Sequence, residues 1–147
     1  MVAQRQQSLQ AVALAGRMPP MNLISFAVIG VGAALGAWGR WILGLWLNPL
    51  FPSMPMGTLA ANLIGGFLIG AAVMVLQINK ELSPELSLFL ITGFLGGLTT
   101  FSTFSAEVVA LIQRAEWGWA MGTVGLHVVG SLLMTGLGIF TVHKLAS

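Results

Sequence analysis

Charged residues are rare in this sequence, and the stretches between them are long enough to cross a bilayer. Four segments are apolar over a sufficient length: residues 22–47, 57–79, 86–106 and 117–143. Arg40 is the only charged residue inside them. Because a hydrocarbon core about 30 Å thick is crossed by about 20 residues of helix, each segment predicts one transmembrane span.

The spans are expected to be helices, because an open sheet would leave backbone groups without hydrogen-bond partners in lipid. Only 7% of the residues are charged and the mean hydropathy is +0.92, whereas a soluble domain carries about 25% charged residues. A net charge of +2 is too small for binding nucleic acid through its phosphates, and the chain has no cysteine. The sequence therefore predicts an all-α membrane protein that is not an enzyme.

Charges outside the spans give little indication of orientation. Residues 1–21 are predicted to form a disordered tail, and residues 22–147 the four-helix transmembrane domain. Without the tail, Lys80 and Lys144 fall on one side of the membrane, and Arg40 and Arg114 on the other. Asymmetry of Lys and Arg sets orientation, so this even distribution favours insertion both ways and a two-fold dimer. The tryptophans lie near predicted span ends, as interfacial residues do: Trp38, Trp41, Trp46, Trp117 and Trp119.

Glycine recurs at a spacing of four residues inside the spans. Such pairs let helix backbones approach closely, and we expect them to pack within the bundle: Gly32 and Gly36, Gly66 and Gly70, Gly93 and Gly97, and Gly118 and Gly122. Gly96 and Gly97 differ because Thr99 and Thr100 follow them in mid-span. Two glycines and two β-branched residues weaken a helix. A broken third helix, with its freed carbonyls facing protein, water or a cation, therefore competes here with simple close packing.

Polar side chains inside the spans are candidates for function, because burying them in lipid is costly. Arg40 either snorkels to the interface or places a positive charge at the mouth of an anion pathway. Asn62 either joins two helices by a hydrogen bond or donates its N–H groups to a ligand. His127, Ser131 and Thr135 form one stripe along the fourth span. Their hydroxyls can instead bond carbonyls of their own helix, and a packing role is the plainer expectation for a lone histidine.

The densest polar group follows the expected break. Phe101 and Phe104 are three residues apart and share a helix face, with Thr100, Thr103 and Glu107 alongside. An aromatic ring has a positive edge, so ring edges together with hydroxyl and amide donors can solvate an anion without trapping it, as conduction requires. This pattern favours a pathway for a small anion.

These residues resemble those of the small bacterial fluoride channels, the Fluc or CrcB proteins. The resemblance covers about residues 23–142. It is most specific in the third span, at residues 92–107 (TGFLGGLTTFSTFSAE), and it extends to residues 57–66 (GTLAANLIGG), 36–40 (GAWGR) and 130–136 (GSLLMTG).

The resemblance implies a passive, fluoride-selective channel that exports this toxic anion across the bacterial inner membrane and so confers resistance. It also implies an antiparallel, dual-topology homodimer in membrane lipid, with two ion pathways at the subunit interface. Phe101 and Phe104 would contact fluoride through ring edges, Asn62 would donate an amide N–H, and Arg40 would lie in the aqueous vestibule. The other pathway residues would form a polar track: Thr58, Ser102, Thr103, Glu107, Ser131 and His127. His127 stands where some relatives carry serine, and an unperturbed imidazole titrates near pH ~6.5.

The resemblance further implies a structural sodium ion. Backbone carbonyls of Gly96 and Thr99, from both subunits, would hold it at the break in the third span. A cation site of this kind needs no carboxylate.

Two other functions fit a four-span chain of this size. A small dual-topology multidrug exporter would need an intramembrane carboxylate in the first span, where the only charged residue is Arg40. A non-conducting membrane subunit would use the hydroxyls and phenylalanines for packing alone. It would leave the coincidence of Asn62, the weakened helix and the phenylalanine pair unexplained.

Overall fold

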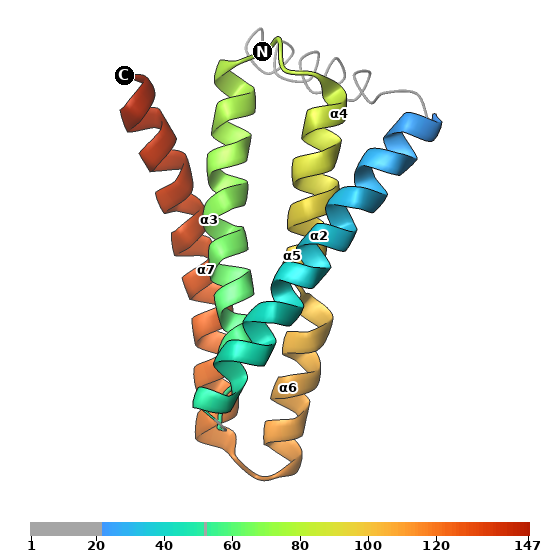
Figure 1. Cartoon of the computed structure of the whole chain (residues 1–147). Helices are drawn as coiled ribbons and strands as arrows, with labels where there is room; N and C mark the ends of the chain where they lie inside the picture. Colours follow the sequence, from blue (N-terminus) through green and yellow to red (C-terminus); the bar gives the residue numbers. More distant parts are fainter. Residues whose placement is uncertain (1–21, 52) are drawn as a thin grey trace, which may run out of the picture.

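The computed structural model describes residues 22–51 and 53–147, and every regular element in this part of the chain is a helix (Figure 1). The predicted tail, residues 1–21, lies outside the described residues. The first two spans are α2 (Leu23–Leu47), followed by the short 3-10 turn η1 (Asn48–Leu50), and α3 (Met56–Ile78). The third span comprises α4 (Pro84–Ser87), η2 (Leu88–Leu95), α5 (Gly96–Leu98) and α6 (Phe101–Gln113), and the fourth is α7 (Trp117–Ala146). Within the described residues, four helical stretches are long and apolar enough to cross a membrane, which confirms the prediction of an all-α protein with four helices capable of crossing it.

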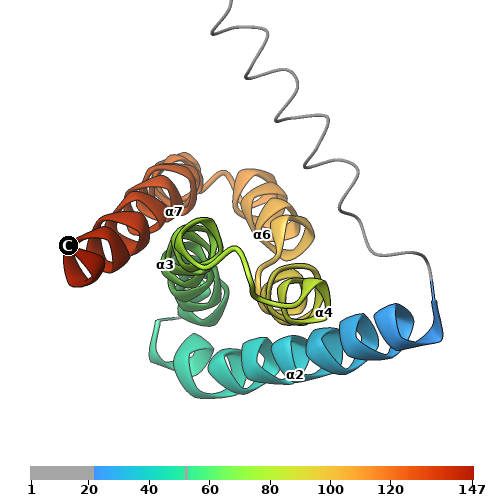
Figure 2. The same cartoon turned by 90° about the horizontal axis from the view of Figure 1, so that it is seen from above.

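α3 lies at the centre of the bundle, as the view from above shows (Figure 2). α7 packs beside α3, whereas α2 crosses the third span obliquely (Figure 1). The α2–α3 and α6–α7 turns lie at one end of the bundle, and the α3–α4 turn and the C-terminus lie at the other. The spans therefore alternate in direction, as short connections between neighbouring helices require.

Backbone meets backbone where α2 crosses the third span. A methyl group on Gly32 would lie 2.6 Å from the Phe89 carbonyl oxygen, and one on Gly93 would lie 2.8 Å from the Ile29 carbonyl oxygen. The other two glycines of this contact meet the opposite backbone at least as closely. We call the contact the glycine seam, formed by Gly32, Gly36, Gly93 and Gly97. Two of the predicted glycine pairs therefore pack against each other within the chain.

A second close contact joins α3 to α7. A methyl group on Gly66 would lie 3.0 Å from the Ser131 carbonyl oxygen, and one on Gly70 would clash with the Thr135 carbonyl oxygen. Gly118 and Gly122 behave differently, because a methyl group on either would have no neighbour within 4 Å. The prediction that this pair packs within the bundle is wrong for the part of the chain that the structure describes, where both glycines are exposed on α7 and face no other helix.

The third span departs twice from regular α-helix. Leu88–Leu95 winds as a π-helix, a rare conformation that is frequent at functional sites. Thr99 (φ −81°, ψ 154°) and Thr100 (φ −153°, ψ 122°) then have extended backbones before α6 begins at Phe101. The π-helical winding was not predicted, because an apolar run has the same composition in either kind of helix.

The turn between α6 and α7 is held by backbone hydrogen bonds. The Ala115 N–H donates to the Ile112 carbonyl and the Glu116 N–H to the Leu111 carbonyl, both at 2.9 Å, which is the Schellman pattern. Ala115 has a φ of 59°, in the left-handed region that glycine more commonly occupies. Arg114 and Glu116 add an ion pair at 2.8 Å. The turn thus brings α7 back alongside α6.

All five tryptophans lie toward the end of the bundle that holds this turn. Trp38, Trp41 and Trp46 are in the second half of α2, and Trp117 and Trp119 are in the first turn of α7. Each has between 42% and 71% of its surface exposed. The predicted interfacial residues therefore form a belt at one end of the chain only.

We expect Gly36→Ala to destabilise the protein, whereas Gly30→Ala on the same helix leaves stability nearly unchanged. A methyl group at Gly36 would clash with the Phe94 carbonyl oxygen, but nothing lies within 4 Å of one at Gly30. Overpacking of this kind costs about 1–3 kcal/mol. Titration with SDS in mixed micelles, followed by tryptophan fluorescence, measures both variants. Equal unfolding midpoints would contradict the close contact at the glycine seam.

Candidate functional site

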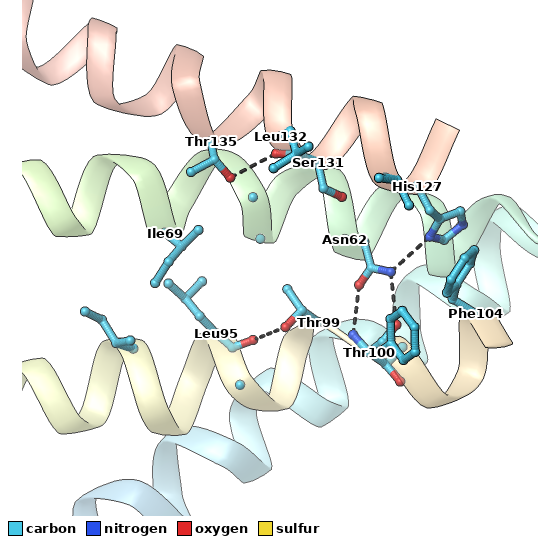
Figure 3. A pocket seen from close by; sticks show the side chains of 16 residues that line it. Asn62, Ile69, Leu95, Thr99, Thr100, Phe104, His127, Ser131, Leu132 and Thr135 are labelled. Atoms are coloured by element: carbon cyan, nitrogen blue, oxygen red, sulfur yellow. Dashed lines mark hydrogen bonds between the residues drawn. The ribbon is translucent and has the colours of Figure 1, made fainter. Parts of the chain in front are cut away.

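α3, the third span and α7 line an open pocket of about 520 Å³ (Figure 3). It lies at the level where α5 ends and α6 begins. Its lining includes six residues with polar side chains: Asn62, Thr99, Thr100, His127, Ser131 and Thr135. Gly96, Phe101 and Phe104 line it as well. The fold therefore gathers most of the predicted site residues of three spans in one place.

Asn62 holds the backbone at the point where the third span is extended. Its Oδ1 accepts a hydrogen bond from the Thr100 N–H at 2.8 Å, and its Nδ2 donates to the Thr100 carbonyl at 3.1 Å. The same residue therefore satisfies both backbone groups of Thr100 (Figure 3). Within a bilayer this matters, because lipid offers no alternative partner for a freed backbone group.

The interruption removes the helical partners of two other carbonyl groups. In a continuous helix the Thr100 N–H would bond the Gly96 carbonyl, and the Thr103 N–H would bond the Thr99 carbonyl. Here the Thr100 N–H donates to Asn62, and the Thr103 N–H donates to the Thr100 hydroxyl at 3.2 Å, an N-cap bond for α6. Gly96 and Thr99 are thus among the carbonyl groups that the interruption releases.

The described residues contain no group of three His, Cys, Asp or Glu side chains that could hold a metal ion. A cation at the interruption would therefore meet backbone oxygens. Carbonyl groups of unwound helix segments are suitable ligands for sodium at membrane depth. The residues present fit a site of this kind.

His127 is buried and is contacted from two sides. Its Nδ1 lies 3.1 Å from Asn62 Nδ2, and its ring stacks on Phe104, with 4.6 Å between ring centroids and 28° between ring planes. Its Nε2 is buried and has no hydrogen-bond partner among the described residues. Asn62, His127 and Phe104 therefore form one contiguous cluster drawn from three helices (Figure 3).

Phe101 and Phe104 are neighbours in different surroundings. Their ring centroids are 5.4 Å apart. Phe104 is only 7% exposed and lies inside the chain against His127, whereas Phe101 is 78% exposed. Both line the pocket, so one of its two aromatic rings has little cover from its own chain.

Thr58 and Glu107 lie outside the pocket lining and contact each other. The Thr58 hydroxyl donates a hydrogen bond to Oε1 of Glu107. Oε2 of Glu107 is buried and has no partner among the described residues. Thr58 precedes Asn62 by one turn of α3, so the pair lies one turn closer to the α6–α7 turn than the pocket cluster does.

Arg40, Thr103 and Ser102 also lie outside the pocket lining. Arg40 donates from Nε to the Gly97 carbonyl at 3.2 Å and from Nη1 to the Thr103 hydroxyl at 3.5 Å. It therefore contacts the third span on both sides of the extended residues. The Thr100 hydroxyl lies 3.1 Å from the hydroxyls of both Ser102 and Thr103, which links these side chains to the interruption.

Ser131 and Thr135 line the pocket one and two turns beyond His127. The Thr135 hydroxyl donates to the Ser131 carbonyl at 2.9 Å. The Thr135 hydroxyl thus bonds a carbonyl of its own helix, which was the alternative to a role in the pathway.

The sequence placed Thr100 beside the phenylalanine pair without assigning it a role, and Thr123 was not predicted as a site residue. Thr100 caps α6, and its backbone N–H donates to Asn62 while its carbonyl accepts from Asn62. Thr123 is 0% exposed, and its hydroxyl has no partner among the described residues. It precedes His127 by four residues. The spacing of four that joins His127, Ser131 and Thr135, continued toward the N-terminus, would therefore have indicated it.

Residues 27–139 match the family described as "CrcB-like protein, Camphor Resistance (CrcB)". The chain belongs to the CrcB family. This confirms the resemblance noted in the sequence. The matched range contains every predicted site residue, from Arg40 to Ser131.

Curated relatives of this CrcB chain are named "Fluoride-specific ion channel FluC". The one from Nitrosospira multiformis is 60% identical over 126 residues, which are 86% of this chain and 98% of the relative. The one from Pseudomonas syringae pv. maculicola is 55% identical over 125 residues, 85% of this chain and 98% of the relative. The one from Pseudomonas putida is 60% identical over 121 residues, 82% of this chain and 95% of the relative.

We expect Thr58→Val to destabilise the protein by about 1–3 kcal/mol, because it leaves Glu107 without its hydrogen-bond donor. Thr141→Val is the matched control. It removes an exposed hydroxyl that bonds only its own helix at Leu137, and it should change stability by less than about 0.5 kcal/mol. Titration with SDS measures both, and similar losses would mean that the Thr58–Glu107 bond contributes nothing particular.

Proposed function

We propose that this protein is a passive, fluoride-selective ion channel that releases fluoride from the cell and so confers fluoride resistance. The observation that carries the proposal is its 60% identity, over 86% of the chain, to a relative named "Fluoride-specific ion channel FluC". The chemistry of the site supports it. Neutral amide, imidazole and hydroxyl groups and two aromatic rings line the pocket, and such groups attract a small anion weakly enough to release it again.

The proposed path follows the polar residues of α3, α6 and α7. The edges of Phe101 and Phe104 contact the ion, Asn62 and His127 adjoin the rings, and Ser131 continues the path along α7. On the other side of the rings it passes a second group of residues: Thr58, Ser102, Thr103 and Glu107. Arg40 lies toward the aqueous entrance, where a positive charge raises the local concentration of anions.

A second copy in the opposite orientation completes each path. Phe101 is 78% exposed in the single chain, and Gly96 beside the interruption is exposed as well, so both are available to a partner. The described residues are also balanced in charge: Lys80 and Lys144 lie in the α3–α4 turn and the last turn of α7, and Arg40 and Arg114 lie toward the opposite end. Balanced Lys and Arg support insertion in both orientations. These features support an antiparallel homodimer about a two-fold axis, with two paths at its interface.

A structural sodium ion is proposed at the interruption of the third span. The carbonyl groups of Gly96 and Thr99 would hold it, together with the same groups of the second copy. The assignment is supported by the loss of the helical hydrogen bonds to these carbonyls, because the Thr100 and Thr103 N–H groups donate to other acceptors. The ion would neutralise converging carbonyl dipoles where two copies meet, and it would take no part in conduction.

The proposed location is the inner membrane of a bacterium. Helical multi-pass chains satisfy their backbone hydrogen bonds within each span, whereas proteins of the bacterial outer membrane are closed barrels of strands. The four helices of this chain and the bacterial sources of its relatives support this location.

Reconstituted protein should release fluoride from liposomes when the membrane potential is clamped with potassium and valinomycin. Chloride should stay inside, because the path offers weak neutral donors suited to a small ion. Ion-selective electrodes measure both anions. Chloride efflux at the fluoride rate would contradict the proposed selectivity.

Phe101→Ile should reduce fluoride efflux by about tenfold or more, a loss equivalent to one good contact with the ion. Phe140→Ile is the control, since Phe140 is 63% exposed on α7 and lines no part of the pocket. It should conduct like the unmodified protein. Unchanged efflux in both variants would remove Phe101 from the path.

Insertion in both orientations can be measured directly because the chain has no cysteine of its own. Leu82→Cys places a single thiol in the α3–α4 turn, at a residue that is 37% exposed. About half of these thiols should react with a membrane-impermeant maleimide on intact spheroplasts, and the rest only after permeabilisation. Complete labelling, or none, would contradict the dual topology.

A further inference from the structure

Three buried side-chain atoms have no hydrogen-bond partner among the described residues: His127 Nε2, Thr123 Oγ1 and Glu107 Oε2. Folded proteins leave few buried polar groups unpaired, and each exception requires a specific explanation. Two of the three atoms belong to one face of α7, because Thr123 and His127 are four residues apart. Both residues are more than nine-tenths buried, at 0% and 5% exposure.

The orientation of the Asn62 amide decides what His127 can do. The Thr100 N–H needs an acceptor, and Oδ1 is the only acceptor of the Asn62 amide, so the Asn62 atom 2.8 Å from it must be Oδ1. The Thr100 carbonyl needs a donor, and Nδ2 is the only donor of the Asn62 amide, so the Asn62 atom 3.1 Å from it must be Nδ2. The backbone of Thr100 therefore excludes the flipped amide, and Nδ2 faces His127.

This orientation selects one form of the imidazole. Asn62 Nδ2 carries only donor hydrogens, one toward Thr100 and one toward His127 Nδ1 at 3.1 Å. Nδ1 must therefore accept, which means that it carries no proton. In a neutral imidazole the proton is then on Nε2. The unpartnered Nε2 of His127 is thus an N–H donor.

The same hydrogen bonds leave Asn62 with no free donor. Both hydrogens of its amide are used within the chain. Turning either hydrogen toward a ligand would leave Thr100 or His127 without its partner. Among the side chains of this cluster, the available N–H group is that of His127.

The unpartnered groups lie on the side of the cluster toward the α6–α7 turn. Thr123 precedes His127 by one turn of α7, and Thr58 precedes Asn62 by one turn of α3. α6 runs in the opposite direction, so Glu107 lies one turn closer to the α6–α7 turn than Thr103 does, and its hydrogen bond with Thr58 places these two residues at one level. The Thr123 hydroxyl therefore adjoins the level of the Thr58–Glu107 pair, where Thr58 already donates to the carboxylate.

We propose that the Nε2–H group of His127 and the hydroxyl of Thr123 form the donor pair that contacts fluoride on this side of Phe104. Asn62 then acts as a positioning residue that holds His127 in the donating tautomer. The inference rests on the proposed function, since it requires that fluoride passes the cluster. Two neutral donors one turn apart bind an anion without the opposite charge that would trap it.

The tautomer is tested by NMR on the full-length protein in lipid bilayers, labelled with ¹⁵N-histidine. The chain has two histidines, so His143→Gln, at an exposed position in the last turn of α7, leaves the signals of His127 alone. We expect a protonated Nε2 and an unprotonated Nδ1. Added fluoride should shift the Nε2 resonance, and the same concentration of chloride should not. A proton on Nδ1, or an Nε2 resonance that fluoride leaves unchanged, would overturn the proposal.

Two substitutions distinguish the roles of the two ring nitrogens of His127 in the liposome assay. His127→Asn keeps an acceptor near the Nδ1 position for Asn62 but lacks the far N–H, whereas His127→Gln keeps an amide N–H near the Nε2 position. We expect efflux to fall about tenfold in the first variant and to stay within about threefold in the second, as for loss of one hydrogen bond to an ion. Equal efflux from the two variants would overturn the proposal.

The two hypotheses fail in different ways. If the unmodified protein releases no fluoride, the proposed function fails, whatever the tautomer. If it releases fluoride while the Asn and Gln variants conduct alike, only the role of His127 fails. Where a variant does not fold, the NMR result on the His143→Gln protein decides.

Discussion

A helix that is interrupted inside a bilayer must find partners for its freed backbone groups within the protein, and here Asn62 supplies them. Its amide bonds both the N–H and the carbonyl of Thr100, which no lipid could do. The rest of the cluster follows from this interaction. The one amide hydrogen that remains turns toward His127, and the imidazole ring then stacks on Phe104. A single side chain thus supports the backbone and orders the pocket.

Fixed charge is kept out of the pocket lining. The two charged side chains nearest to it are each held by other groups: Glu107 by the Thr58 hydroxyl, and Arg40 by the Gly97 carbonyl and Thr103. The pocket itself is lined by amide, imidazole and hydroxyl groups. The scarcity of charge that indicated a membrane protein therefore also describes the local chemistry of the site.

Much of the fold could be predicted because the responsible signals are local in sequence. Charge-free segments indicated four spans, and the spacing of Gly32 and Gly36 indicated a close helix contact. The π-helical winding of Leu88–Leu95 could not be predicted, since it leaves no trace in an apolar composition. The bond between Asn62 and His127 depends on how two spans that are distant in sequence align. The sequence therefore indicated both residues as candidates but could not predict that they contact each other. Phe101 and Phe104 were expected on one face, and only the packing of α7 places one ring inside and leaves the other uncovered.

The glycine seam has a consequence for how the protein responds to its bilayer. With no side chains between the two backbones, α2 and the third span cannot change their crossing angle by small rotations of intervening groups. A thinner or thicker membrane is normally accommodated by helix tilt. At the seam little room is left for such tilting, because a methyl group on any of the four glycines would lie within 2.8 Å of the opposite backbone. The seam therefore opposes independent tilting of α2 and of the helical part of the third span that precedes the interruption.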